Sequence, residues 1–116
     1  MFGDSIIEIS ESAYKNNLDF LYNHILREGV RFSSVVKGNA YGHGIENFVP
    51  MAKRCGVNHF SVFNADEAYR VKSCGADPVD LMIMGMVENE ALDWAVEQGV
   101  SFFVFNQGRL ERALAA

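Results

Sequence analysis

The sequence predicts an α/β fold with a parallel sheet, because a helix, a glycine and a short apolar strand follow one another four times. Glycine followed by a small apolar residue occurs at Gly29, Gly56, Gly75 and Gly99. A glycine just past a helix readily adopts the left-handed conformation that satisfies the last carbonyls, so these positions mark four helix ends. Strands separated by helices of about 10 to 15 residues are typical of a doubly wound sheet or of a (β/α) barrel, and periodicity leaves both open.

The spacing of apolar residues places the individual elements. Strands are predicted at residues 32–36, 59–62, 81–84 and 101–105, which are short and apolar. Apolar residues three and four positions apart predict helices over 14–26 and 45–52, and residues 109–116 are typical of the helix after the fourth strand. Asn64 followed by Glu67 is a capping pair that predicts the start of a further helix.

Composition excludes several classes of protein. With 116 residues the chain forms at most one domain, and 49% hydrophobic with 22% charged residues is typical of a globular segment. No apolar run approaches the ~20 residues of a membrane span, and the first residues do not have the pattern of a secretory signal. A net charge of −5 argues against a nucleic-acid partner. The three histidines do not have the spacing of a metal site, so we expect none. Packing explains Cys55 and Cys74 better than a disulfide does.

The most informative segment is residues 37–44, with the sequence KGNAYGHG. Lys37 stands at the end of a predicted strand, and three glycines in the next seven residues allow the backbone to turn sharply and approach a ligand. Alternation along the strand places Lys37 on the face of Val35 and Ser33. A lysine in this position can present its amine to a carbonyl group.

These eight residues resemble the pyridoxal-phosphate attachment signature of the alanine racemase family, Lys-Ala-Asn/Asp-Ala-Tyr-Gly-His-Gly. Seven of eight positions agree, and Gly38 replaces the usual alanine. A chance match to seven residues at ~1 in 20 each is on the order of one in a billion per site. The resemblance continues in the opening residues 7–9 and 17–18, the helix before Gly56, and the apolar strand that ends at Gly85.

The resemblance implies a function and its residues. Lys37 would be the catalytic lysine and would hold pyridoxal 5'-phosphate as an imine, and Tyr41 would hydrogen-bond the cofactor phosphate. Asn39, His43 and the glycines would shape the turn. The family interconverts L- and D-alanine, a route to a peptidoglycan precursor, in the cytoplasm and as a homodimer. Its second base is a tyrosine of the C-terminal domain of the other subunit, outside this sequence.

The resemblance also implies the alanine racemase type of parallel (β/α) barrel, with residues 1–116 as the N-terminal part of the barrel domain and no complete second domain. About four of eight strands fit, so we expect half a barrel whose inner face exposes Val35, Val62 and Phe103. This chain alone should therefore be inactive. Three alternatives stay open: a non-catalytic cofactor-binding or assembly module, a racemase of another amino acid, and a decarboxylase or homeostasis protein of the same barrel class.

Overall fold

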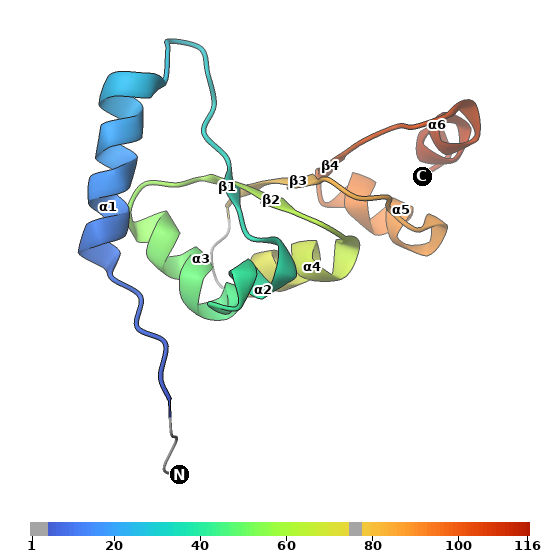
Figure 1. The fold of residues 1–116 in the computed structure, drawn as a ribbon. Helices are drawn as coiled ribbons and strands as arrows, with labels where there is room; N and C mark the ends of the chain where they lie inside the picture. Colours follow the sequence, from blue (N-terminus) through green and yellow to red (C-terminus); the bar gives the residue numbers. More distant parts are fainter. Residues whose placement is uncertain (1–4, 75–77) are drawn as a thin grey trace.

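The computed structural model describes residues 5–74 and 78–116 (Figure 1). These residues form a single sheet, helices of eight to ten residues and shorter helical turns. The elements, in chain order, are α1 Glu11–Phe20, η1 Leu21–Ile25, β1 Ser34–Val35, α2 Lys37–Tyr41, α3 Ile45–Arg54, β2 His59–Val62, α4 Ala65–Ser73, β3 Asp80–Ile83, α5 Asn89–Glu97, β4 Ser101–Phe102 and α6 Gln107–Leu114.

The four strands are parallel, as the repeated pattern predicts, and lie in the order β1-β2-β3-β4. Each helix between two strands therefore returns the chain to the same end of the sheet, and all strand carboxyl ends meet at one edge. Helices α3, α4 and α5 lie on one face of the sheet (Figure 1). A doubly wound sheet has helices on both faces, so this arrangement favours the barrel over the doubly wound alternative.

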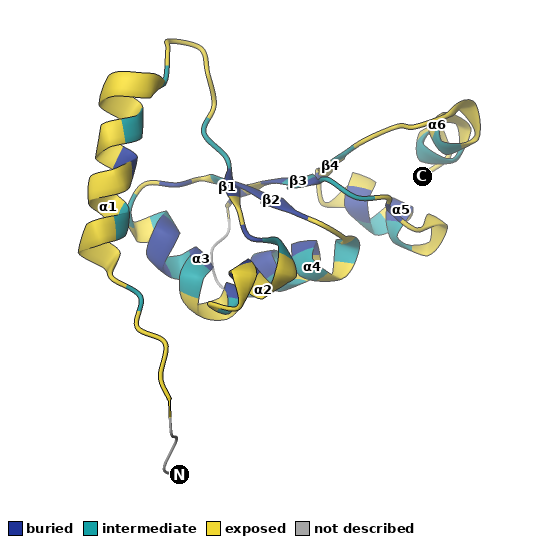
Figure 2. Ribbon diagram, viewed as in Figure 1, coloured by how far each residue is buried: buried dark blue, intermediate teal, exposed yellow. Residues whose placement is uncertain are grey.

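The core lies between the sheet and these helices, and Figure 2 shows the buried residues on the helix surfaces that face the sheet. Apolar residues at alternate strand positions point toward the helices and are fully or almost fully buried. They include Phe60 and Val62 from β2 and Leu81 and Ile83 from β3. Helix residues such as Val49, Val71 and Leu92 meet them.

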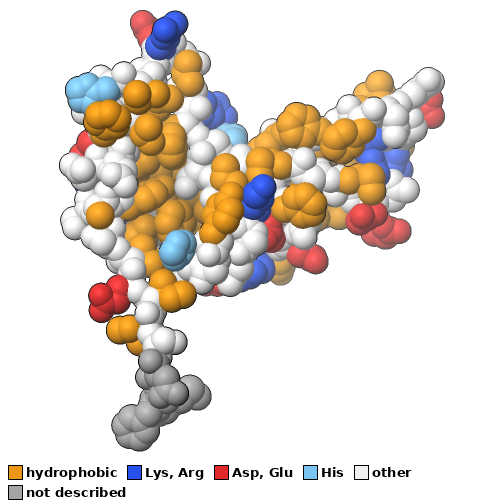
Figure 3. All heavy atoms as spheres, in the orientation of Figure 1, with side chains coloured by type: hydrophobic (Ala, Val, Ile, Leu, Met, Phe, Trp, Pro, Cys, Tyr) orange, Lys and Arg blue, Asp and Glu red, His pale blue; other side chains and the backbone are white. Residues whose placement is uncertain are grey.

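The opposite face of the sheet is uncovered. Val35 is 38% exposed and Phe103 is 50% exposed, as predicted, and Figure 3 shows hydrophobic side chains gathered on this side. The prediction for Val62 was wrong: it is buried under the helices, and Ser61, the register partner of Val35, faces the other way but is itself only 6% exposed. Alternation fixes the two faces of a strand, but the choice between them depends on its neighbours. The radius of gyration is 16.1 Å, against about 13 Å for a closed domain of this length.

Several predicted boundaries differ from the structure. The first and fourth strands were predicted to have five residues each, but only two residues of each pair in the sheet. They are shorter because each has a neighbouring strand on one side only. The first helix ends in a π-helical turn at Ile25, and Gly29 lies in the turn beyond it with φ +80°. Gly56 and Gly99 follow helix ends with positive φ, as predicted. Gly75 lies outside the described residues.

Candidate functional site

Only Val36 separates Lys37 from the end of β1, and Lys37 is the first residue of α2, at the end of the sheet where the strand carboxyl ends meet. The N–H of Val36 donates to the carbonyl of Ser61 at 2.8 Å, so β1 stays paired with β2 up to the lysine. Val36 is fully buried under the helices and Val35 is on the open face, the alternation on which the prediction for Lys37 depends. Lys37 is partly buried, and among the described residues no side chain or backbone group pairs with its ammonium group.

The backbone after Lys37 forms a left-handed turn. Gly38, Asn39 and Ala40 have φ of +61°, +56° and +55° with ψ of +42° to +46°, and Tyr41 has φ +55°. Only glycine adopts this conformation freely, and each L-residue in it costs about 1–2 kcal/mol. Strain of this kind is concentrated at functional sites and persists only where surrounding contacts hold it. The three glycines of the motif, Gly38, Gly42 and Gly44, also have positive φ, the conformation that glycine adopts at the lowest cost.

Glu67 provides one set of these contacts. Its Oε1 accepts hydrogen bonds from the N–H groups of Gly38 at 2.7 Å and Asn39 at 3.3 Å. Its Oε2 accepts from the N–H of Phe63 at 2.9 Å, and its own N–H donates to the side chain of Asn64 at 2.9 Å. The predicted capping pair therefore exists. The same carboxylate also reaches back to the turn that follows Lys37.

Asn39 and Arg70 provide a second set of contacts that hold the left-handed turn. Asn39 Oδ1 accepts from the N–H of Ile45 at 3.1 Å and from Arg70 Nη2 at 2.6 Å. The Arg70 guanidinium also donates to both carboxylate oxygens of Glu46, at 2.7 and 2.8 Å. These hydrogen bonds to Arg70 lower the pKa of Glu46, and the same bonds raise the pKa of Arg70. Asn39 thus shapes the turn, as the resemblance implies, and Arg70 joins the turn to α3 and α4.

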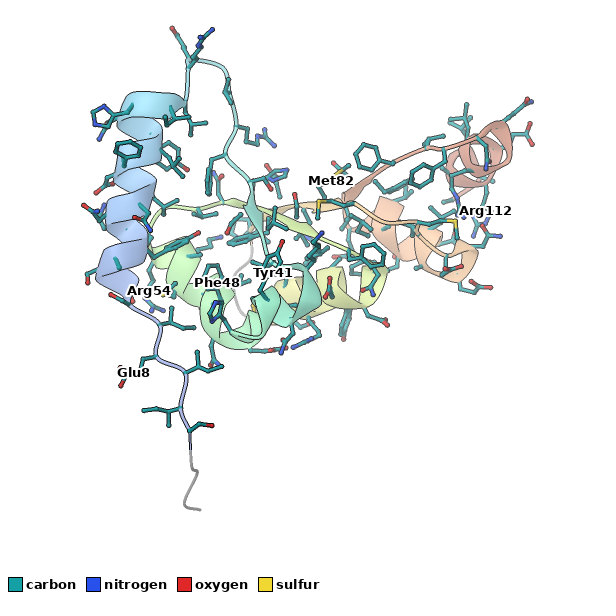
Figure 4. The ribbon with its side chains drawn as sticks, viewed as in Figure 1. Glu8, Tyr41, Phe48, Arg54, Met82 and Arg112 are labelled. Atoms are coloured by element: carbon teal, nitrogen blue, oxygen red, sulfur yellow. The ribbon has the colours of Figure 1, made fainter. Side chains whose placement is uncertain are left out.

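The other motif residues differ in their surroundings. Tyr41 projects from α2 and is 65% exposed (Figure 4), so its hydroxyl is accessible to a ligand. Ala40 is buried, which explains a small side chain there. At Gly38 an added Cβ would meet no atom within 4 Å, so the alanine of the signature would fit the available space. His43 stacks on Phe48, with ring centroids 6.2 Å apart.

A hollow of about 450 Å³ lies between the loops that follow β2 and β3. The carboxylates of Asp66, Glu88 and Glu90 are among its lining residues, so it does not suit a phosphate group. The two loops approach closely where they leave the sheet: the N–H of Gly85 donates to the carbonyl of Phe63 at 2.9 Å. No group of three or more metal-ligating side chains occurs in residues 5–74 and 78–116.

The sequence-based reasoning did not assign Glu67, Arg70 or Glu46 to this site. The capping signal at Glu67 was recognised, but it reports only the local helix start. The contact with the lysine turn joins residues 28 and 29 positions apart and depends on the pairing of β1 with β2. Lys37 and Tyr41 were recognised because they occur in one contiguous motif.

The fold and this site define a class of protein: a parallel (β/α) barrel segment that presents a lysine at the carboxyl end of its first strand. Comparison with known families agrees. The family described as "Alanine racemase, N-terminal domain" matches residues 9–116. The chain therefore belongs to the alanine racemase N-terminal domain family, and its sheet is the corresponding part of that barrel.

Individual relatives are covered over only part of their own length. The alanine racemase of Listeria monocytogenes serotype 4a is 34% identical over 105 residues, which is 90% of this chain and 28% of the relative. The alanine racemase structure from E. faecalis is 30% identical with a TM-score of 0.80, covering 91% of this chain and 28% of that one. A histidine racemase structure from Leuconostoc mesenteroides subsp. sake shares the fold, with a TM-score of 0.78 and 20% identity over 90% of this chain and 27% of that one. The chain thus spans little more than a quarter of these proteins.

Proposed function

We propose that this chain carries the cofactor lysine of a pyridoxal-phosphate-dependent amino-acid racemase, and that residues 1–116 form the N-terminal part of its barrel domain. The single observation that carries this proposal is the site at Lys37. A partly buried lysine without a partner among the described residues ends a strand, and a strained left-handed turn follows it. The turn has the residues of the family signature at seven of eight positions.

The residues present fit the cofactor. Lys37 would hold it as an imine between Nζ and the aldehyde carbon, since the amine has no competing ion pair in the described part of the chain. The exposed hydroxyl of Tyr41, on the same turn, would donate a hydrogen bond to its phosphate. When bound, the cofactor supplies delocalisation of the negative charge left on a substrate Cα that has lost its proton.

This chain supplies one of the two proton-transfer groups that racemisation requires. The Lys37 amine would move a proton on one side of the substrate Cα. The group for the other side, by resemblance a tyrosine of the partner subunit in a homodimer, lies outside residues 1–116. Activity therefore belongs to the complete protein, a cytoplasmic racemase in this proposal. The described residues include no helix long and apolar enough to cross a membrane.

Alanine is the proposed substrate, because the Listeria and E. faecalis relatives, each at least 30% identical, are alanine racemases. The histidine racemase of the same fold supports a second candidate, a racemase of another amino acid. The test is the rate of L-to-D conversion for a panel of amino acids by the complete polypeptide loaded with cofactor. We expect alanine to be the best substrate and Lys37→Arg to abolish turnover, because a guanidinium cannot form the imine. Turnover retained by Lys37→Arg would exclude the proposed role.

A third candidate function, a non-catalytic binding or assembly module, is favoured by the uncovered sheet face with its exposed Val35 and Phe103. Cofactor added to the chain would distinguish the two parts of this alternative. A visible absorbance band of a protonated imine indicates a binding module. Association of the chain without such a band indicates a module of assembly only.

A further inference from the structure

Glu67 occupies a position that local helix capping does not explain. In a capping box the glutamate at the third helical position reaches back to the N–H of the capping residue itself. Here Oε2 accepts instead from Phe63, one residue before the cap, and Oε1 is directed to Gly38 and Asn39. One carboxylate therefore joins the end of β2 and the start of α4 to the turn after Lys37.

The N–H groups that Glu67 holds are the first two after the lysine. The next N–H, of Ala40, donates within the turn to the carbonyl of Val36 at 2.8 Å. Gly38 and Asn39 are exposed, so water is the alternative partner for their N–H groups, and a hydrogen bond to a charged acceptor is stronger than one to a neutral partner. With Glu67 in place, the groups of Gly38 and Asn39 are both satisfied in the left-handed conformation.

The Glu67 carboxylate acts as a clamp on the N–H groups of Gly38 and Asn39, and other contacts hold Glu67 itself in place. The N–H of Glu67 donates to the side chain of Asn64, which fixes the first turn of α4. One helical turn later, Arg70 donates to the side chain of Asn39 and to Glu46 on α3. Helix α4 thus contacts the lysine turn through two side chains that lie three residues apart, on the same side of the helix.

We propose that Glu67 is a positioning residue, whose carboxylate holds the left-handed turn and so directs the Lys37 amine toward an incoming aldehyde. The role in directing Lys37 rests on the proposed function, whereas the claim that Glu67 holds the turn does not depend on it. Gly38 makes such a clamp more important in this chain, because glycine leaves the backbone beside Lys37 freer than the alanine of the family signature.

The test compares Glu67→Ala and the nearly isosteric Glu67→Gln with Asp66→Asn as matched control. Asp66 is the neighbouring acidic residue in the first turn of α4, so its substitution removes the same charge from the same helix end. The first readout is hydrogen exchange of individual amides in the wild-type and variant chains. We expect the Gly38 and Asn39 amides to exchange about ten times faster or more in Glu67→Ala, with a smaller effect in Glu67→Gln. The β2–β3 amides should remain protected.

The second readout is the rate at which pyridoxal phosphate and borohydride label Lys37, relative to Lys15 on the surface of α1 in the same molecule. The ratio of the Lys37 labelling rate to the Lys15 labelling rate should fall in Glu67→Ala and stay unchanged in Asp66→Asn. Unchanged exchange at Gly38 and Asn39 would overturn the clamp. Faster exchange with an unchanged labelling ratio would overturn the positioning role, leaving a structural one. If wild-type Lys37 labels no faster than Lys15, the proposed function fails instead, and the exchange result still decides the clamp.

Discussion

Replacement of Gly85 by alanine should destabilise the chain more than the same change at Gly38 or Gly108. A Cβ at this position would lie 2.5 Å from the carbonyl oxygen of Phe63 and 3.0 and 3.2 Å from its ring. The ring can move, but the carbonyl oxygen belongs to the backbone and accepts the N–H of Gly85. Overpacking costs about 1–3 kcal/mol and loss of this hydrogen bond about 0.5–1.5 kcal/mol. We therefore expect a loss of about 1.5–4.5 kcal/mol in the free energy of unfolding.

The same single-methyl change at the two other glycines provides matched controls. At Gly108 in α6 the added Cβ would meet only Asn106 Oδ1 at 3.5 Å, and alanine is the better helix former, so stability should rise by up to ~1 kcal/mol. At Gly38 there is space, and only the left-handed conformation opposes alanine, so the cost should be about 1 kcal/mol. Urea unfolding followed by circular dichroism at one protein concentration measures all three. If Gly85→Ala unfolds at the same urea concentration as Gly108→Ala, the described close approach of Gly85 to the Phe63 backbone is wrong.

Three further results are expected. Tyr41→Phe should weaken cofactor binding by about 1.5–3 kcal/mol, or one to two decades of affinity, with unfolding unchanged; equal affinity measured by absorbance titration would leave Tyr41 as a packing residue. Burial lowers the pKa of His59, with Arg31 adding to the effect and Asp80 opposing it, so unfolding should become easier as pH falls from about 6.5 through the folded pKa. His59→Gln should remove this dependence, and a variant with the wild-type pH profile would contradict it. The 116-residue chain should self-associate through its uncovered sheet face, and a stable monomer in sedimentation at micromolar concentration would refute this.

The parallel sheet and the lysine motif could be predicted from the sequence because each depends on a local pattern, whereas the strand order followed only from the barrel that the family resemblance implies. The middle strands lie within one residue of their predicted positions, at His59–Val62 and Asp80–Ile83. The lengths of the two outer strands were overestimated, because pairing with the one neighbouring strand decides how many residues of an outer strand belong to the sheet. The prediction that Val62 lies on the open face was wrong for a related reason. Which face of a strand is buried depends on its pairing with neighbouring strands, and the strand's own sequence does not determine it.

The residues of the candidate site likewise fall into those that the sequence could predict and those that it could not. Lys37, Asn39 and Tyr41 could be named from a contiguous signature. The positive φ of Gly38, Gly42 and Gly44 explains why this segment tolerates three glycines, one more than the family signature has. Glu67 and Arg70 could not be assigned, because their contacts with the turn cross from α4 to the end of β1. Such contacts arise only once the strands have paired, and a single sequence carries no local signal for them.

The measurement that tests the central claim most directly is the site of cofactor attachment. The complete protein is incubated with pyridoxal phosphate, reduced with borohydride, digested and mapped by mass spectrometry. We expect the reduced label on Lys37, the lysine at the strand end before the left-handed turn. Label on Lys53 or Lys72 in place of Lys37 would contradict the account.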